Sequence, residues 1–203
     1  MLVVVSHPDD AEIWVGGTIL NHRKCGFGVH LVYTHAGVEH RREEAIAAAA
    51  LYGAVVHFLD SDPPETELAS VIKAVAPSII ITHWTGDSHP EHVATGKLVM
   101  DLIPDLLVET GLKFTTYACD TYNSLGLDRV FNPSVYVDVS SVWTKKERLI
   151  SCYRSQPTQY WLSMMSQQCA LHGSRCGVEK AEAFVQLPML GVLRGAQKLL
   201  REW

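Results

Sequence analysis

The sequence predicts an α/β fold, in the form of a Rossmann-like three-layer α/β/α domain around a mostly parallel sheet. Short β-rich runs alternate with longer helical segments along the chain, which is the pattern of repeated βαβ units. The first run, beginning at Leu2, is uniformly apolar, as expected for a parallel strand that helices cover on both faces. There is no internal repeat, low-complexity tract or linker, so we expect residues 1–203 to form one domain.

Local signals predict each element in turn. Strands are predicted where short apolar runs lie between turn residues, at Leu2–Ser6, Val29–Thr34, Val55–Leu59, Ser78–His83, Phe114–Cys119 and Val135–Val139. Helices are predicted where longer segments end at glycine or before proline, at Thr18–Lys24, Glu39–Tyr52, Glu65–Val75, His89 or Pro90 to about Glu109, and Val142–Tyr153. Pro104 is expected to kink the fourth helix. The rest of the chain is predicted to be helical or irregular.

The composition excludes several classes of protein. A formal net charge of −5 argues against a general nucleic-acid binder, which would carry a basic face. No apolar run is long enough to span a membrane. The apolar residues after Met1 lead into acidic ones without a basic start, so we expect no signal peptide. The five cysteines lack a CxxC pair, which is typical of reduced thiols in a cytoplasmic protein.

Histidines and carboxylates follow two of the predicted strands. SHPDDAE occupies residues 6–12, at the end of the first strand, and HWTGDSHPEH occupies residues 83–92, at the end of the fourth. In open α/β sheets, ligands bind beyond the carboxyl ends of the strands, where the strand order reverses. If the first and fourth strands are neighbours, both clusters open onto one crevice.

The residue types in these clusters favour a zinc site. His89 and His92 are three residues apart at the start of a helix, so they lie on one face of it. Imidazole nitrogens with carboxylate oxygens suit Zn²⁺, and a spare carboxylate can act as general base. Either Asp9 or Asp10 alone could be a helix N-cap, and one HxxH is a weak signal. Two such clusters in one sheet favour the metal site.

The paired motifs resemble those of the LmbE-like, or PIG-L, family of zinc-dependent N-acetylglucosamine deacetylases. HPDDAE after the first strand and HPEH after a later one carry the resemblance. Further segments resemble the family in the same order, namely EIWVGGTIL, RREEAIAAAALYG, VDVSSVWTKKERLISCYRSQ and EKAEAF. The resemblance implies hydrolysis of an N-acetyl amide on an N-acetylglucosamine-type sugar, with release of acetate and a free amine.

Matched by motif position, the resemblance also implies individual roles. One Zn²⁺ per chain, or another divalent metal, would be held by His7, Asp10 and His92. Asp9 would be the base that deprotonates the attacking water. His89 would stabilise the developing oxyanion or aid proton delivery.

Other residues are expected on the substrate side of the site. Arg41 would contact substrate hydroxyls or phosphate, with an exposed helix arginine as the alternative. Trp14 would shape the pocket or simply pack, and Trp84 would stack on a sugar ring or pack. Asp87 stands where some family members have a tyrosine, and we expect it to orient a histidine beside the substrate. Glu91 is not expected to be a ligand.

Three alternatives fit the sequence less well. A metal-dependent phosphoesterase is the main one, although the clusters hold few carboxylates for a two-metal site. A nucleotide-dependent oxidoreductase needs GxGxxG after its first strand, where this chain has HPDD. A binding module has little use for a base beside a ligand. The expected partner is an N-acetylated amino sugar, with no nucleic acid, and the resemblance is compatible with a homo-oligomer. The walls of the substrate pocket are expected near residues 35–39, 84–88, 122–133 and 156–161.

Overall fold

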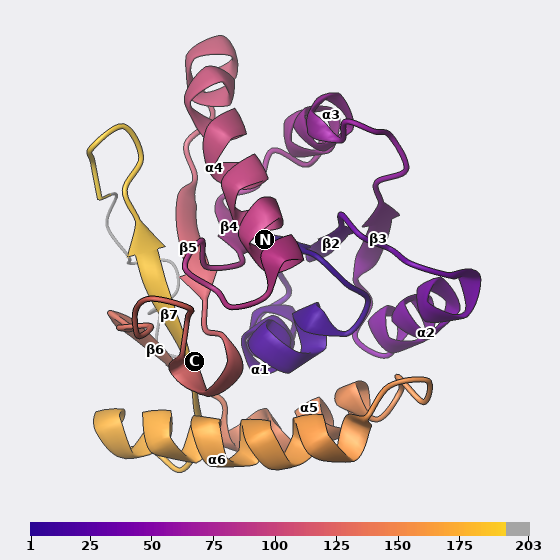
Figure 1. Cartoon of the computed structure of the whole chain (residues 1–203), viewed down its shortest axis with the longest axis vertical. Coiled ribbons are helices and arrows are strands. Elements are labelled where there is room, and N and C mark those ends of the chain that lie inside the picture. The colour runs from indigo at the N-terminus through magenta and orange to yellow at the C-terminus, as the bar shows by residue number, and fades with distance from the viewer. Residues whose placement is uncertain (194–203) are drawn as a thin grey trace.

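A seven-stranded sheet lies between helices in the computed structural model, which describes residues 1–193 (Figure 1). The strands are β1 (Leu2–Val5), β2 (His30–Tyr33), β3 (Val55–Phe58), β4 (Ile79–Thr82), β5 (Thr115–Cys119), β6 (Val135–Asp138) and β7 (Ala181–Leu187). Their order is β3-β2-β1-β4-β5-β7-β6. β1 to β5 pair in parallel, whereas β7 is antiparallel to both of its neighbours. The predicted α/β fold with a mostly parallel sheet is confirmed.

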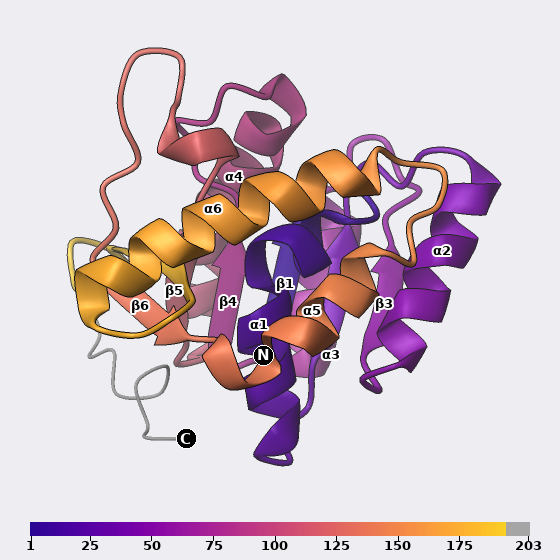
Figure 2. The ribbon, with the colours of Figure 1, turned by 90° about the horizontal axis from the view of Figure 1, so that it is seen from below.

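Helices cover both faces of the sheet. They are α1 (Asp10–Lys24), α2 (Glu39–Ala50), α3 (Glu65–Val75), α4 (Pro90–Thr110), α5 (Trp143–Ile150) and α6 (Thr158–Cys176). α3 and α4 pack on one face, and α1 and α2 pack on the other. α5 packs against α1, and α6 packs against α5 and against β6 and β7 at one end of the sheet (Figure 2).

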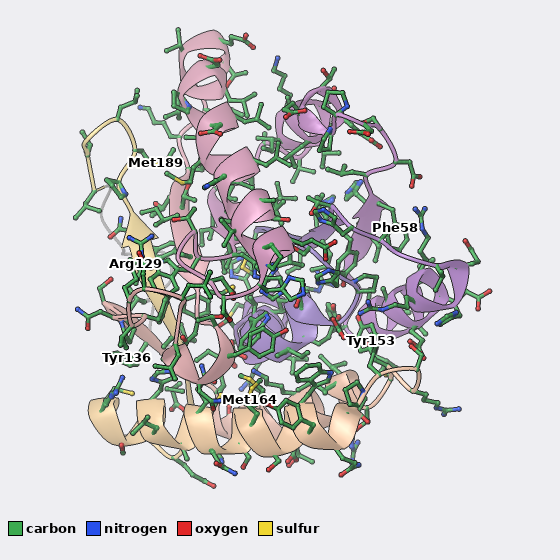
Figure 3. The ribbon with its side chains drawn as sticks, in the orientation of Figure 1. Phe58, Arg129, Tyr136, Tyr153, Met164 and Met189 are labelled. Carbon is green, nitrogen blue, oxygen red and sulfur yellow. The ribbon has the colours of Figure 1, made fainter. Side chains whose placement is uncertain are left out.

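The core divides into two apolar clusters because successive strand residues point to opposite faces. Within β1, Leu2 and Val4 belong to the cluster under α3 and α4, and Val3 and Val5 belong to the cluster under α1. All four are fully buried. Met164 points from α6 into the second cluster and extends the core beneath that helix (Figure 3). The uniformly apolar first strand is therefore explained by cover on both faces.

Two predicted elements differ from the structure. α1 begins at Asp10 and not at Thr18, because tertiary contacts outweigh the low helix propensity of its two glycines. Glu182 accepts hydrogen bonds from the backbone N–H groups of Gly17 (2.7 Å) and Thr18 inside this helix. The segment predicted as helical or irregular contains β7. The predicted fourth helix agrees with α4, which includes Pro104 and ends at Thr110.

Two of the expectations from composition can be compared with the described residues. No helix within residues 1–193 has both the length and the apolar character that a membrane crossing requires. All five cysteines are free thiols there. The predicted single domain also includes residues 194–203, which lie outside the described part of the chain.

Candidate metal centre

The two motif clusters meet at one edge of the sheet because β1 lies between β2 and β4. Leu2 is in register with His30 on one side and with Ile80 on the other, in parallel. The carboxyl ends of β1 and β4 therefore lie at the same edge of the sheet, at the point where the strand order reverses. The expectation that the first and fourth strands are neighbours is confirmed.

The HPDD loop is held in place by its own second aspartate. The backbone N–H of His7 donates a hydrogen bond to Asp10 Oδ2 (2.7 Å), and the N–H of Asp10 donates to the His7 carbonyl (3.1 Å). Asp9 lies between them with φ of 116°, a backbone conformation that non-glycine residues rarely adopt. Strain of this kind concentrates at functional sites.

His7, Asp10 and His92 form one group whose ligand atoms lie within 4.8 Å of one another. His7 Nδ1 is 3.2 Å from Asp10 Oδ2, and His92 Nε2 is 3.4 Å from Asp10 Oδ1. Two further groups share members with it, formed by His7, His89 and Glu91 and by His83, Asp87 and His92. The structure thus brings the three predicted metal ligands together in one cluster.

His92 has the donor arrangement that a metal ligand needs. Its Nδ1 donates to Asp87 Oδ2 at 2.9 Å, which fixes the ring orientation and directs Nε2 toward Asp10. Within residues 1–193, this fully buried Nε2 atom has no hydrogen-bond partner. Carboxylates commonly orient metal-bound histidines in this way. The residues present therefore fit a metal ion with nitrogen and oxygen ligands.

The electrostatics of the cluster are those of a site built for positive charge. Burial opposes ionisation of Asp10, but the charge of His92 and the contacts with His83 and His7 hold the pKa of Asp10 well below its usual range. Burial also opposes the charged form of His92, yet Asp10 and Asp87 raise the pKa of its ring to about 10. A cation at this cluster would take the place of that proton.

Asp9 is almost fully buried and is paired with an arginine from α2. Arg41 Nη2 lies 3.1 Å from Asp9 Oδ2 and donates a hydrogen bond to the Pro8 carbonyl at 2.6 Å. Arg41 is therefore folded onto the HPDD loop, and the alternative of an exposed helix arginine is wrong. Burial, followed by the neighbouring charge of Asp10, raises the pKa of Asp9 well above that of a free aspartate.

His89 is the residue that precedes α4, and its ring lies over the cluster. The His89 ring centroid is 4.5 Å from that of His92 and 5.1 Å from that of His7. Burial and these two neighbours lower the pKa of His89, which favours a neutral ring. His89 Nδ1 is buried without a hydrogen-bond partner among the described residues, so it remains available to a ligand.

The two tryptophans expected on the substrate side, Trp14 and Trp84, have different surroundings. Trp14 is 2% exposed, donates from Nε1 to Asp10 Oδ1 at 3.2 Å and meets the Tyr122 ring edge-on. It therefore packs directly behind Asp10. Trp84 is half-buried, and its ring meets Phe131 edge-on at 5.4 Å, on the loop that follows β5.

The structure also shows contacts that the motifs did not indicate. Glu91 Oε2 lies 2.5 Å from His7 Nε2, so this acidic residue has a closer contact with the cluster than we expected. His83 is fully buried beside Asp10, where burial and the charge of His92 lower the pKa of its ring to about 4. The position of His83 at the end of the fourth strand was the one signal in the sequence for this contact.

Comparison with known proteins shows a family and a relative to which this chain is similar in sequence. The family model for PIG-L, described as GlcNAc-PI de-N-acetylase, matches residues 2–103, just over half of the chain. A 4-oxalmesaconate hydratase of Pseudomonas putida is 28% identical over 76% of this chain and 73% of its own length.

Solved structures show the same fold. A conserved protein of Thermus thermophilus has a TM-score of 0.78 at 22% identity and covers 96% of this chain and 97% of its own. The N,N′-diacetylchitobiose deacetylase of Pyrococcus horikoshii has a TM-score of 0.76, also at 22% identity, over 98% of this chain and 88% of its own. At this level of identity the likeness establishes the architecture.

Proposed function

The chain belongs to the PIG-L family and is an enzyme of that family, and from this premise we propose that it removes the acetyl group from an N-acetylated amino sugar. The products would be acetate and the free amine. We also propose that residues 1–203 form one domain of this kind, with a single divalent metal, zinc, as its cofactor.

One observation carries the proposal: a buried carboxylate lies directly beside a cluster of side chains that could hold a metal ion. The ligand atoms of His7, Asp10 and His92 lie within 4.8 Å of one another, and Asp9 follows the same strand in a strained, buried conformation. Hydrolysis of an amide needs a deprotonated water, a group that withdraws electrons from the carbonyl, and an acid for the leaving amine. Residues of these kinds are gathered at this edge of the sheet.

His7, Asp10 and His92 would hold the zinc ion. When bound there, zinc makes water nucleophilic at neutral pH and polarises the substrate carbonyl. Asp87 holds the Nδ1–H of His92 and so keeps the ligand nitrogen of that ring free. Trp14 and His83 close the site behind Asp10, which keeps bulk water away from that side.

Asp9 would take a proton from the attacking water and return it to the amine nitrogen as the carbon–nitrogen bond breaks. Burial raises the pKa of Asp9, which makes it a stronger base than an ordinary aspartate. Arg41 holds Asp9 on one side by an ion pair and would also contact substrate hydroxyls. His89 would donate a hydrogen bond to the oxyanion that forms on the former amide oxygen.

Hydration of an unsaturated acid is the second candidate function, because a relative of 28% identity is a hydratase. A metal, a base and neutral histidines can also add water across a carbon–carbon double bond that is conjugated to a carbonyl. A metal-dependent phosphoesterase is the alternative that the sequence offered, and none of the relatives named above is described as one.

Release of free amine from a panel of N-acetylated glycosides tests the proposal. We expect turnover on at least one amino-sugar substrate by the zinc-loaded chain, and loss of turnover after removal of metal by a chelator. The same preparation would be assayed for hydration of unsaturated dicarboxylic and tricarboxylic acids. Hydration without any amine release would contradict the deacetylase proposal and favour the second candidate.

A further inference from the structure

A chain of side-chain hydroxyl groups runs from the first strand to His35, next to the metal centre. Ser6 Oγ lies 2.8 Å from Thr95 Oγ1, which lies 2.6 Å from Thr34 Oγ1, which lies 2.9 Å from His35 Nδ1. Ser6 and Thr95 are fully buried, so these groups bond to one another and not to bulk water.

The direction of every hydrogen bond in this chain is determined at its buried end. Ser6 Oγ donates its one proton to the carbonyl of Glu91 at 2.9 Å, since a carbonyl can only accept. Thr95 must therefore donate to Ser6, and Thr34 must donate to Thr95. With its proton used, Thr34 can only accept from His35, so Nδ1 of His35 carries a proton.

The tautomer of His35 follows from this count of protons. In the neutral ring the proton sits on Nδ1, and Nε2 keeps a lone pair that accepts hydrogen bonds. No hydrogen bond to His35 Nε2 is found within residues 1–193. This acceptor is therefore available to a ligand.

His35 also lines a pocket beside the metal centre. The pocket has a volume of about 470 Å³, and its polar wall consists of Thr34, His35, Ser61, Asp62, Glu65 and Thr95. No lysine or arginine lines it, so its acceptors suit a neutral donor of hydrogen bonds and repel a carboxylate or a phosphate. The His35 ring centroid is 6.0 Å from that of His7, so one ligand can reach both places.

We infer that His35 is a substrate-binding residue whose Nε2 accepts a hydrogen bond from a sugar hydroxyl, with Thr34, Thr95 and Ser6 as positioning residues that fix its tautomer. The inference rests on the proposed function for the identity of the ligand. The tautomer itself is a property of the free enzyme and is independent of that function.

The tautomer is measured directly by NMR of the zinc-loaded chain labelled with ¹⁵N in histidine. We expect a protonated Nδ1 and an unprotonated Nε2 for His35. In Thr34→Val the acceptor for Nδ1–H is lost, and the ring should shift toward the Nε2–H form. Thr34→Ser should restore the wild-type spectrum. Thr82→Val is the matched control, because Thr82 is a buried threonine at the end of β4 whose hydroxyl has no partner within the described residues.

The binding role is measured by comparing two replacements of His35. Glutamine can place an acceptor near the position of Nε2, whereas asparagine can reach only the position of Nδ1. His35→Gln should keep KM for the amino sugar near the wild-type value. His35→Asn should raise KM about fivefold to tenfold, the size expected for one lost hydrogen bond, with kcat and metal content little changed.

The outcomes separate the two proposals. An Nε2–H or doubly protonated His35 in the wild type at pH 7.5, or equal KM values for the two His35 variants, would overturn the inference while deacetylation stands. Absence of any amine release together with the expected spectra would instead remove the proposed function and leave the fixed tautomer in place.

Discussion

Asp9 combines a left-handed backbone, deep burial and an arginine partner in a single carboxylate. The strained backbone and the burial of the carboxylate both cost folding free energy, and the arginine partner offsets part of the cost of burial. A strained non-glycine residue alone costs on the order of 1–3 kcal/mol. An N-cap would need none of the three. The Asp9 side chain caps no backbone N–H of α1, which favours the role of a base held beside the ligand set.

We predict that Asp9→Asn binds metal as the wild type does but loses at least about 10²-fold in kcat, the usual size of a general-base contribution. The amide keeps the size of the side chain and cannot take a proton. Amine release under saturating substrate and elemental analysis of the same preparation measure the two effects. Wild-type turnover by Asp9→Asn would show that another group is the base.

At the residue scale, the sequence indicated the candidate metal ligands but not the contacts around them. His7, Asp10 and His92 stand in motifs whose spacing fixes them near a strand end, so their meeting could be predicted. The contacts of Glu91 and His35 could not, because they depend on which way each side chain leaves its backbone. Hydrogen-bond direction at His35 also depends on Ser6 and Thr95, which come from distant parts of the chain.

α1 is the element that links the metal centre to the rest of the fold. Its first residue is Asp10, and its middle is held by Glu182 of β7, which also forms a buried ion pair with Lys146 of α5 at 2.6 Å. Glu12, in the first turn of the helix, accepts hydrogen bonds from Tyr52 and Tyr153 at 2.6 Å each. These buried contacts fix both the rotation and the position of the helix that presents Asp10.

The two glycines of α1 give a matched pair of variants. A Cβ at Gly17 would collide with the branched side chain of Val139, whereas a Cβ at Gly16 would come no closer than 3.4 Å, to Lys146 Cγ. We predict that Gly17→Ala lowers the free energy of unfolding by about 1–3 kcal/mol through overpacking. Gly16→Ala should be neutral or stabilise the chain by up to about 1 kcal/mol, because alanine favours a helix. Urea unfolding of both variants measures the difference; equal stabilities would contradict the packing described here.

At the element scale, the two errors in the predicted secondary structure, at α1 and at β7, have a common cause. The two adjacent glycines have low helix propensity, so the local sequence does not predict a helix there. The start of α1 was missed because the contacts of Gly17 with Glu182 and Val139 join residues far apart in the sequence. The strand β7 follows α6 after a short loop, but it runs antiparallel to β5 and β6, and this pairing joins segments that lie far apart in the sequence. α3, with a strongly amphipathic pattern and local end signals, was predicted with its observed bounds.

At the scale of the whole molecule, the strand order creates the site. Because β1 lies between β2 and β4, loops from both sides of the sheet converge at one edge while both faces are covered by helices. The pattern of alternating strands and helices predicts this architecture, and the motif positions predict where the crevice opens. The order of the last three strands, in contrast, is set by tertiary pairing that no local pattern encodes.

The stability of the whole molecule should depend on pH through His22, which is buried near the end of α1. Burial, together with the positive charges of the N-terminus and Arg23, lowers the pKa of His22 to about 4. The unfolded chain takes up a proton near pH 6.5, so this contribution to stability is complete above that pH and is lost as pH falls toward 4.

We predict that His22→Leu makes the free energy of unfolding less dependent on pH between 6.5 and 4, by about 1–2 kcal/mol after allowance for solvent screening. Urea unfolding at several pH values, with wild type and variant side by side, measures the change. Parallel curves for the two proteins across this range would show that His22 is protonated as easily in the folded chain as in the unfolded one.

The metal content of the purified chain tests the central claim most directly. With His7, Asp10 and His92 as ligands, elemental analysis should find about one zinc ion per wild-type chain and none in His92→Ala. His40→Ala, at an exposed position on α2, is the control and should keep its metal. A wild-type chain without bound metal, or a His92→Ala variant that retains it, would contradict the account.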